Sequence, residues 1–165
     1  MSMYNKINIG VIGATGYTGL DLVLLLSKHP RVKIKYLCAT KNLGKEISLF
    51  DKRIKKKLPK ISLLKKINWK TLDLVFLSLP NGEAQKLIKK NFYKNKKLKF
   101  IDLSADFRLS NAKVYEKNYK IKHKAKNLIK YSLYSIPELN KKIDKKIRII
   151  SNPGCYPTSI QIPLV

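Results

Sequence analysis

A glycine-rich segment between two apolar runs constrains the fold more than any other feature of this chain. The run Lys6–Ile12, KINIGVI, is rich in β-branched residues and ends at the segment Gly13–Gly19, GATGYTG. Apolar residues then recur at helical spacing over Leu20–Lys28, and Val32–Cys38 alternates as a second strand would. Strand, glycine loop, helix and strand make a βαβ unit, whose crossover is expected to be right-handed.

The rest of the chain continues this alternation. Short apolar runs predict further strands at Ile61–Leu64, Leu72–Leu79, Phe100–Leu103 and Arg148–Ile150. Helices are expected at Glu83–Phe92 and Pro137–Asp144, a loop with a short helix at Asn42–Lys60, and mostly irregular structure at Ser110–Tyr134. The predicted fold class is therefore α/β, a Rossmann-type, doubly wound and mostly parallel sheet.

The spacing of the glycines predicts a dinucleotide site in the glycine loop. Gly13 permits a tight turn, Gly16 lets the backbone approach a pyrophosphate, and Gly19 lets the helix pack on the strand. Free N–H groups at the start of the helix would face the phosphates. The predicted cofactor-binding residues of this loop are Gly13, Thr15, Gly16, Tyr17, Thr18 and Gly19. The alternative is an ordinary glycine-rich turn between a strand and a helix.

The end of the second strand indicates which dinucleotide is bound. NAD sites usually carry an Asp or Glu there for the ribose hydroxyls. Here the sequence is Cys-Ala-Thr-Lys, with no acid, and the hydroxyl of Thr40 and the ammonium of Lys41 suit a 2′-phosphate. NADP is therefore favoured over NAD, although Lys41 is also one lysine among many.

The charge of the chain has two interpretations. Lys and Arg number 36 against 10 Asp and Glu, a net charge of +26, which is typical of proteins that bind nucleic acid or anionic surfaces. Lys, Ile and Asn share AT-rich codons, however, and the lysines are scattered along the chain, so base composition explains the excess without a specific nucleic-acid partner. A basic binding module stays as the non-enzyme alternative, with its best case in the tyrosines that lie among lysines: Tyr115, Tyr119, Tyr131 and Tyr134.

Composition also bears on location. No apolar stretch reaches about 18 residues, so no transmembrane helix is expected. The first residues do not read as a secretory signal, and two cysteines make no disulfide framework. These features favour a soluble, cytoplasmic protein.

Cys155 is the candidate nucleophile. It follows a strand and a Pro-Gly turn and is expected to open a helix, where a thiolate is favoured. The alternative is a small buried residue, an interpretation that fits Cys38 better. A thiolate beside a nicotinamide would attack an activated acyl group, and reduction of the thioester would release an aldehyde. His29 and His123 are expected on the solvated surface and offer no convincing acid or base.

Five strings, in order along the chain, resemble the N-acetyl-gamma-glutamyl-phosphate reductase family. They are Gly13–Gly19, Leu79–Gly82, Ile101–Leu109 (IDLSADFRL), Pro137–Leu139 and Asn152–Thr158 (NPGCYPT). The resemblance implies NADPH-dependent reduction of N-acetyl-L-glutamyl 5-phosphate to N-acetyl-L-glutamate 5-semialdehyde, with release of phosphate, in arginine biosynthesis. A related reductase of carrier-bound aminoadipyl phosphate and an aspartate-semialdehyde dehydrogenase remain alternatives.

The resemblance also assigns roles to residues. Cys155 would be the nucleophile, and Arg108 and Asn152 would bind the acyl phosphate, for which a guanidinium fork is suited. Leu79 and Pro80 would line the nicotinamide end of the cofactor site. Asn81 stands where the family usually has His. An ion pair of Arg108 with a nearby aspartate, Asp102 or Asp106, is the structural alternative.

The family is about twice as long as this chain, in keeping with two domains. We therefore expect residues 1–150 to form an NADP-binding domain and residues 151–165 to begin a truncated α/β catalytic domain. The remainder would carry the catalytic His and the subunit interface of a homo-oligomer. This chain alone is expected to be inactive as a reductase.

Overall fold

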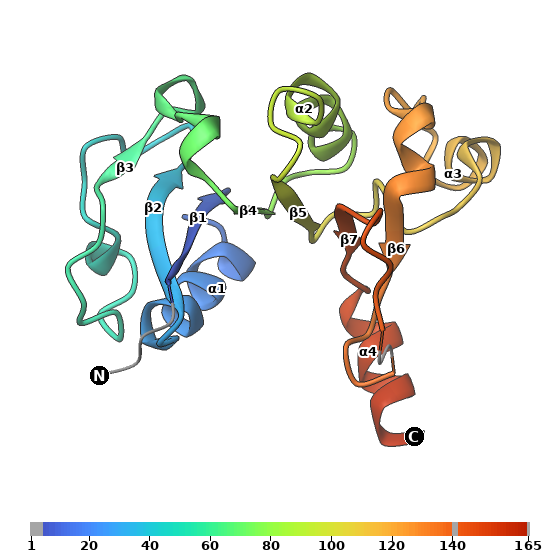
Figure 1. The fold of residues 1–165 in the computed structure, drawn as a ribbon. Helices are drawn as coiled ribbons and strands as arrows, with labels where there is room; N and C mark the ends of the chain where they lie inside the picture. Colours follow the sequence, from blue (N-terminus) through green and yellow to red (C-terminus); the bar gives the residue numbers. More distant parts are fainter. Residues whose placement is uncertain (1–4, 140–141, 165) are drawn as a thin grey trace. The chain divides into compact units, whose positions relative to one another are not determined.

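The computed structural model describes residues 5–139 and 142–164, and the chain divides between Ser78 and Leu79 into two compact units. In Figure 1 the first unit runs from blue to green and the second from yellow-green to red. Both consist of parallel strands joined by helices or long connections, so the predicted α/β class is confirmed.

The first unit contains the predicted βαβ unit. Strand β1 (Ile7–Ile12) leads into helix α1 (Tyr17–Lys28), and strand β2 (Val32–Cys38) returns parallel to β1. Strands β3 (Ile61–Ser62) and β4 (Leu74–Leu77) extend the sheet on its two sides in the order β3-β2-β1-β4, with every pair parallel. Helix α1 lies against β1 and β2.

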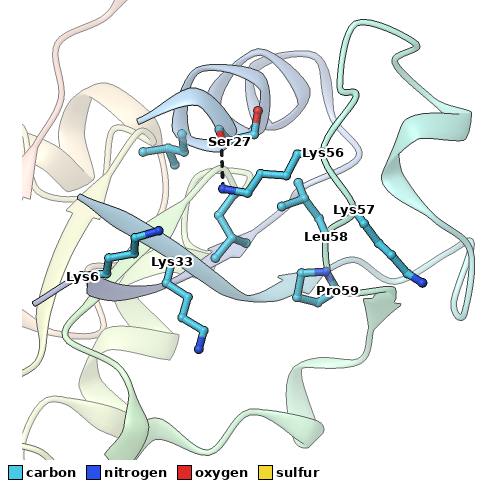
Figure 2. A pocket seen from close by; sticks show the side chains of 9 residues that line it. Lys6, Ser27, Lys33, Lys56, Lys57, Leu58 and Pro59 are labelled. Atoms are coloured by element: carbon cyan, nitrogen blue, oxygen red, sulfur yellow. Dashed lines mark hydrogen bonds between the residues drawn. The ribbon is translucent and has the colours of Figure 1, made fainter. Parts of the chain in front are cut away.

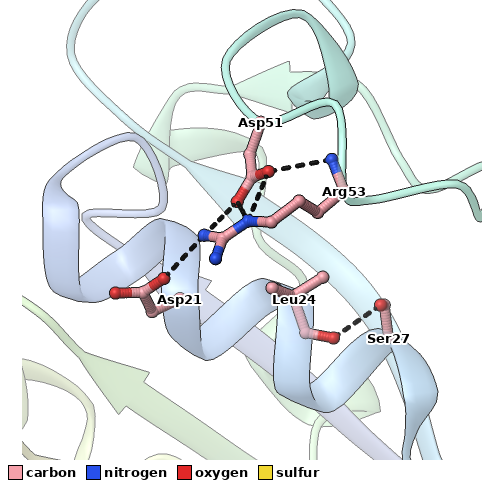
Figure 3. A network of polar contacts seen from close by, with 5 residues as sticks. All are labelled: Asp21, Leu24, Ser27, Asp51 and Arg53. Carbon is pink, nitrogen blue, oxygen red and sulfur yellow. Dashed lines mark hydrogen bonds and ion pairs between the residues drawn. The ribbon is translucent and has the colours of Figure 1, made fainter.

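A long connection between β2 and β4, which includes β3, is held to helix α1 by polar contacts. It contains three short 3-10 helices, at Ile47–Leu49, Leu64–Lys66 and Trp69–Thr71. Arg53 binds the carboxylate of Asp51 and reaches Asp21 on α1 at 2.9 Å (Figure 3). Because Arg53 and Asp21 are exposed, solvent screens this bridge and we expect it to add little to stability.

The second unit has three parallel strands in the order β5-β7-β6. Its strands are β5 (Lys99–Asp102), β6 (Ser132–Tyr134) and β7 (Ile149–Ser151). Its helices are α2 (Glu83–Asn91), α3 (Ala112–Tyr119) and α4 (Cys155–Gln161), with 3-10 segments at Lys126–Tyr131 and Ile162–Leu164.

Asp106, from the loop after β5, organises the second unit. Its carboxylate accepts the N–H groups of Gly82 (2.7 Å) and Gln85 (2.9 Å), and so caps the start of α2. The hydroxyl of Tyr115, on α3, donates to the same carboxylate at 2.6 Å. A buried carboxylate thus joins α2, α3 and the β5 loop.

Two expectations about local structure are wrong. The segment Ser110–Tyr134 is not mostly irregular, because it contains α3, a 3-10 helix and β6. Asn111 caps α3 by accepting the N–H groups of Lys113 and Val114, and Tyr115 anchors the helix in the core. This polar helix has few apolar residues to mark it in the sequence.

The helix expected at Pro137–Asp144 is also absent from the described residues of that range. Residues 137–139 make a turn, with the N–H of Leu139 donating to Ile136 at 2.9 Å, and residues 142–144 are coil. Residues 137–139 are exposed, so a helix would gain no buried face here. Residues 140–141 lie outside the described part.

Candidate functional site

The glycine loop, Gly13–Gly19, leaves no room for side chains at two of its glycines. Gly13 has φ +84°, and a Cβ there would lie 1.9 Å from the carbonyl oxygen of Ser78, which follows β4. A Cβ on Gly19 would lie 2.1 Å from the oxygen of Gly13. The tight turn at Gly13 and the close packing of α1 at Gly19 therefore occur as predicted.

The backbone of the loop presents unused donors. The N–H groups of Gly13 and Ala14 donate to Cys38 at the end of β2, at 2.9 and 3.0 Å. The first helical hydrogen bond of α1 runs from Leu20 to Gly16, so the N–H groups of residues 17–19 precede it, and no side chain caps this end. Such a helix start is suited to phosphate.

Gly16 differs from its two neighbours in the motif. Its φ is −75°, and the nearest atom to a Cβ on it would lie 3.6 Å away, an ordinary contact. No described residue of the first unit therefore requires glycine at this position. The predicted reason, close approach of a pyrophosphate, fits this open space but stays a prediction.

Thr40 and Lys41 lie on the exposed segment directly after β2, whose last carbonyl accepts the glycine-loop amides. They are therefore beside the loop within the first unit, where a 2′-phosphate site is predicted. Leu79 and Pro80 begin the second unit, next along the chain from Ser78. Their role at the nicotinamide stays a prediction.

In the second unit, Arg108 lies against the segment that contains the cysteine. Its Nε donates to the carbonyl of Asn152 at 3.0 Å, and its Nη2 donates to Leu103 at 3.2 Å. Its Nη1 would lie 3.2 Å from a Cβ on Gly154, so glycine provides the space for the guanidinium. We call Arg108, Asn152, Gly154 and Cys155 the thiol site.

The hydrogen bonds of Arg108 among the described residues go to carbonyl oxygens. None of the ion pairs between described residues joins Arg108 to Asp102 or Asp106, so that alternative is wrong. The carboxylate of Asp106 caps α2 instead, and that of Asp102 accepts from Ser104. A guanidinium has five N–H donors, and two of its nitrogens make these bonds. The remaining donors are available to an anion.

Cys155 is the first residue of α4, as predicted, and it is exposed. The alternative that it is a small buried residue is wrong. Cys38 is the buried cysteine, 1% exposed, and burial raises the pKa of its thiol. The two cysteines therefore differ in accessibility as a nucleophile and a structural residue would.

Asp102, at the end of β5, is a buried acid that sequence reasoning did not single out as a site residue. Its backbone carbonyl accepts the N–H of Asn152 at 2.8 Å, and its Oδ1 accepts two bonds from Ser104. Its Oδ2 and the hydroxyl of Ser151, its partner on β7, are buried without a hydrogen-bond partner among the described residues. Burial raises the pKa of Asp102 to about 6.

Of the two histidines, one differs from expectation. His29 is exposed, as expected. His123 is 2% exposed, with Nε2 2.8 Å from the carbonyl oxygen of Asp106, and burial lowers its pKa. It packs edge-on against the rings of Phe107 and Tyr115. The lysine-rich sequence around His123 gives no sign of these contacts.

The structure also shows the environments of Asn81 and Tyr115. Asn81, which stands where the family usually has His, accepts the N–H of Ala105 at 3.0 Å and so holds the β5 loop. Tyr115 is fully buried, so it cannot stack on bases as the nucleic-acid alternative would need.

Within the described residues, no helix is long and apolar enough to cross a membrane.

The glycine loop and the parallel strands define an α/β fold of the Rossmann type, with a loop suited to binding a nucleotide. Residues 8–147 match the family "Semialdehyde dehydrogenase, NAD binding domain", and the chain belongs to this family.

Among curated proteins the chain is similar to N-acetyl-gamma-glutamyl-phosphate reductases. It is 42% identical to the probable chloroplastic enzyme of Arabidopsis thaliana over 160 residues, which are 96% of this chain and 39% of the relative. It is 44% identical to the enzyme of Brachyspira hyodysenteriae over 165 residues, 96% of this chain and 46% of the relative. The chain thus spans less than half the length of these relatives.

Solved structures agree on the fold. Aspartate semialdehyde dehydrogenase II of Vibrio cholerae matches with a TM-score of 0.68 at 16% identity, over 97% of this chain and 45% of that one. Aspartate semialdehyde dehydrogenase of Candida albicans, solved with NADP, matches with a TM-score of 0.50 at 26% identity, over 66% of this chain and 32% of that one.

Proposed function

We propose that this chain is the cofactor-binding part of an NADPH-dependent N-acetyl-gamma-glutamyl-phosphate reductase. The observation that carries the proposal is the packing of Arg108 against Gly154, directly before the exposed Cys155. An anion-binding guanidinium beside a nucleophile suits an acyl phosphate. The identity of 39–44% to reductases of this name supports the substrate.

In the proposed reaction the Cys155 thiolate attacks the acyl carbon, and the bond from that carbon to the phosphate oxygen breaks. Arg108 and Asn152 hold the phosphate as it leaves, which gives a thioester on Cys155. When bound, NADPH supplies the hydride that reduces this thioester. The resulting thiohemiacetal collapses to N-acetyl-L-glutamate 5-semialdehyde and restores the thiolate.

The preference for NADP rests on the end of β2. Thr40 and Lys41 are exposed there, beside the glycine loop, and offer a hydroxyl and an ammonium to a 2′-phosphate. The glycine loop, Gly13–Gly19, would hold the pyrophosphate on the N–H groups of residues 17–19. Leu79 and Pro80 would lie at the nicotinamide.

Residues 1–150 would then be the NADP-binding domain, and residues 151–165 the start of a catalytic domain. We propose that the acid or base of the reaction and the contacts of a homo-oligomer belong to the part that the longer relatives have and this chain lacks. The 165-residue chain would therefore bind cofactor without turnover. We propose a cytoplasmic location for this chain, whereas the plant relatives are named chloroplastic.

The test begins by sequencing the gene past the codon for Val165 and producing the whole open reading frame. We expect that product to oxidise NADPH with N-acetyl-L-glutamyl 5-phosphate and to release one phosphate per NADPH. The Cys155→Ser variant should lose turnover, and Cys38→Ser should keep it. Preference for carrier-bound aminoadipyl phosphate would refute the substrate, and turnover by the 165-residue chain would refute its proposed inactivity.

A further inference from the structure

A hollow in the first unit lies apart from the glycine loop. It has a volume of about 470 Å³ and is formed by the end of α1, the starts of β1 and β2, and the connection before β3 (Figure 2). Nine residues line what we call the lysine hollow: Lys6, Leu26, Ser27, Lys33, Ile34, Lys56, Lys57, Leu58 and Pro59. The glycine loop follows the carboxyl end of β1, whereas the lysine hollow lies at the amino ends of β1 and β2.

The floor of the lysine hollow is apolar. Ile34 on β2 is buried, and Leu26, Leu58 and Pro59 are half-buried around it. Concave, mostly apolar sites of roughly 300–1,000 Å³ are typical of small-molecule binding. The lysine hollow is within that range, so it can accept an aliphatic chain or a single ring.

The rim of the lysine hollow carries only positive charge. Of the described residues that line it, four are lysines and none has a carboxylate. Among the ion pairs of the described residues, none involves Lys6, Lys33, Lys56 or Lys57. An anion placed here would relieve the repulsion between these ammonium groups without displacing an existing carboxylate.

Lys56 is exposed, but its ammonium group contacts the end of α1 beside the lysine hollow. Its Nζ lies 3.4 Å from the carbonyl oxygen of Ser27, in the last turn of α1. The carboxyl end of a helix carries a partial negative charge, so an ammonium group is favoured at this position. In Figure 2 the ammonium groups of Lys6 and Lys56 point toward one another, whereas that of Lys57 points away.

We propose that the lysine hollow binds a small amphipathic anion, a carboxylate attached to an aliphatic chain or ring. The apolar part would lie on Leu26, Ile34 and Leu58, and the carboxylate would lie between the ammonium groups of Lys6 and Lys56. This site is separate from the predicted cofactor residues. It does not depend on the proposed reductase activity.

Octanoate is a suitable probe, because it joins one carboxylate to a chain that the volume accommodates. We would titrate the ¹⁵N-labelled 165-residue chain with octanoate and follow the backbone amide shifts. Saturable shifts are expected at residues 26–27, 33–34 and 56–58, without comparable shifts at residues 13–19. Octylammonium, which has the same chain and the opposite charge, should not produce them.

Matched variants separate this site from general attraction to a basic protein. The double variant Lys6→Gln/Lys56→Gln should weaken octanoate binding about five- to tenfold. Lys94→Gln/Lys96→Gln removes the same charge from exposed positions in the second unit and should leave the affinity unchanged. Equal weakening by both pairs, equal shifts with octylammonium, or shifts spread over lysines throughout the chain would each overturn the proposal.

Discussion

The glycine loop and the thiol site are built in opposite ways. In the glycine loop, carbonyl oxygens lie where the Cβ atoms of Gly13 and Gly19 would be, so the backbone path is fixed by the first unit itself. In the thiol site, Arg108 makes hydrogen bonds to the carbonyls of Leu103 and Asn152, and the cysteine that follows Asn152 in this segment is exposed. A phosphate cradle of backbone amides can be preformed by local packing, whereas a site of exposed side chains needs further groups around it.

Substitution of Gly13 should have the largest effect and tests the rigid side of this comparison. In Gly13→Ala the new Cβ would meet the carbonyl oxygen of Ser78 at 1.9 Å, at a φ of +84°. We expect a loss of about 3 kcal/mol or more in the free energy of unfolding, measured by urea titration.

Gly16→Ala is the matched control in the same loop, since the nearest atom to its Cβ would be 3.6 Å away. It should change the free energy of unfolding by less than about 1 kcal/mol and yet weaken binding of NADPH. Equal destabilisation by both substitutions would contradict the account of the loop.

The next effect concerns Asp102, beneath the thiol site. Its pKa is raised by burial from 3.8 to about 6, so its stabilising contribution is present below about pH 3.8 and is lost as the pH rises through 6. At about 1.4 kcal/mol per pKa unit, the free energy of unfolding of the wild type should fall by about 2–3 kcal/mol between pH 4 and pH 7. The Asp102→Asn variant should not show this fall.

Urea titrations of both proteins across this pH range would measure that difference. Asp144→Asn is the control, because Asp144 is exposed and its pKa is lowered by hydrogen bonds from Lys146. Its stabilising contribution is lost as the pH falls, the opposite sign. A parallel pH dependence of the wild type and Asp102→Asn would show that the carboxyl group is not buried as described.

The two cysteines offer a smaller contrast. Cys155 is exposed, whereas Cys38 is 1% exposed with a pKa raised by burial. Iodoacetamide should therefore alkylate Cys155 about 30-fold faster than Cys38 at pH 7.5. Mass spectrometry of the Cys38→Ser and Cys155→Ser variants would assign the two phases, and a single common rate would contradict the exposure of the thiol site.

The smallest effect is expected at Lys41. Lys41→Glu should weaken NADPH about fivefold to tenfold and NADH much less, because only NADPH carries the 2′-phosphate. Calorimetric titration with each cofactor measures the ratio, and Lys45→Glu, another exposed lysine of the same connection, is the control. An equal loss for both cofactors would remove the argument for a 2′-phosphate site.

The parts of the fold that the sequence predicts correctly are those that depend on patterns among neighbouring residues. The β1–loop–α1–β2 unit follows from glycine spacing and from runs of apolar residues with strand or helix periodicity. The helical position of Cys155 follows likewise from the Pro-Gly turn before it.

The parts that could not be predicted depend on contacts between distant residues. His123 and Tyr115 lie among lysines in the sequence, and they are buried by packing against one another and by bonds to Asp106. The guanidinium of Arg108 reaches a carbonyl 44 residues away, which no local pattern encodes. Residues 137–139 show the opposite case. Their sequence pattern predicts a helix, but they are exposed and form a turn because no surface is available to bury a helix face.

The most direct test of the account is a titration of the 165-residue chain with NADPH, followed by the fluorescence of the nicotinamide. The account predicts saturable binding that is tighter than for NADH, weakened by Gly16→Ala and unaffected by Cys155→Ser. Absence of saturable binding by the folded chain, or binding that Gly16→Ala leaves unchanged, would contradict a preformed phosphate cradle in the glycine loop.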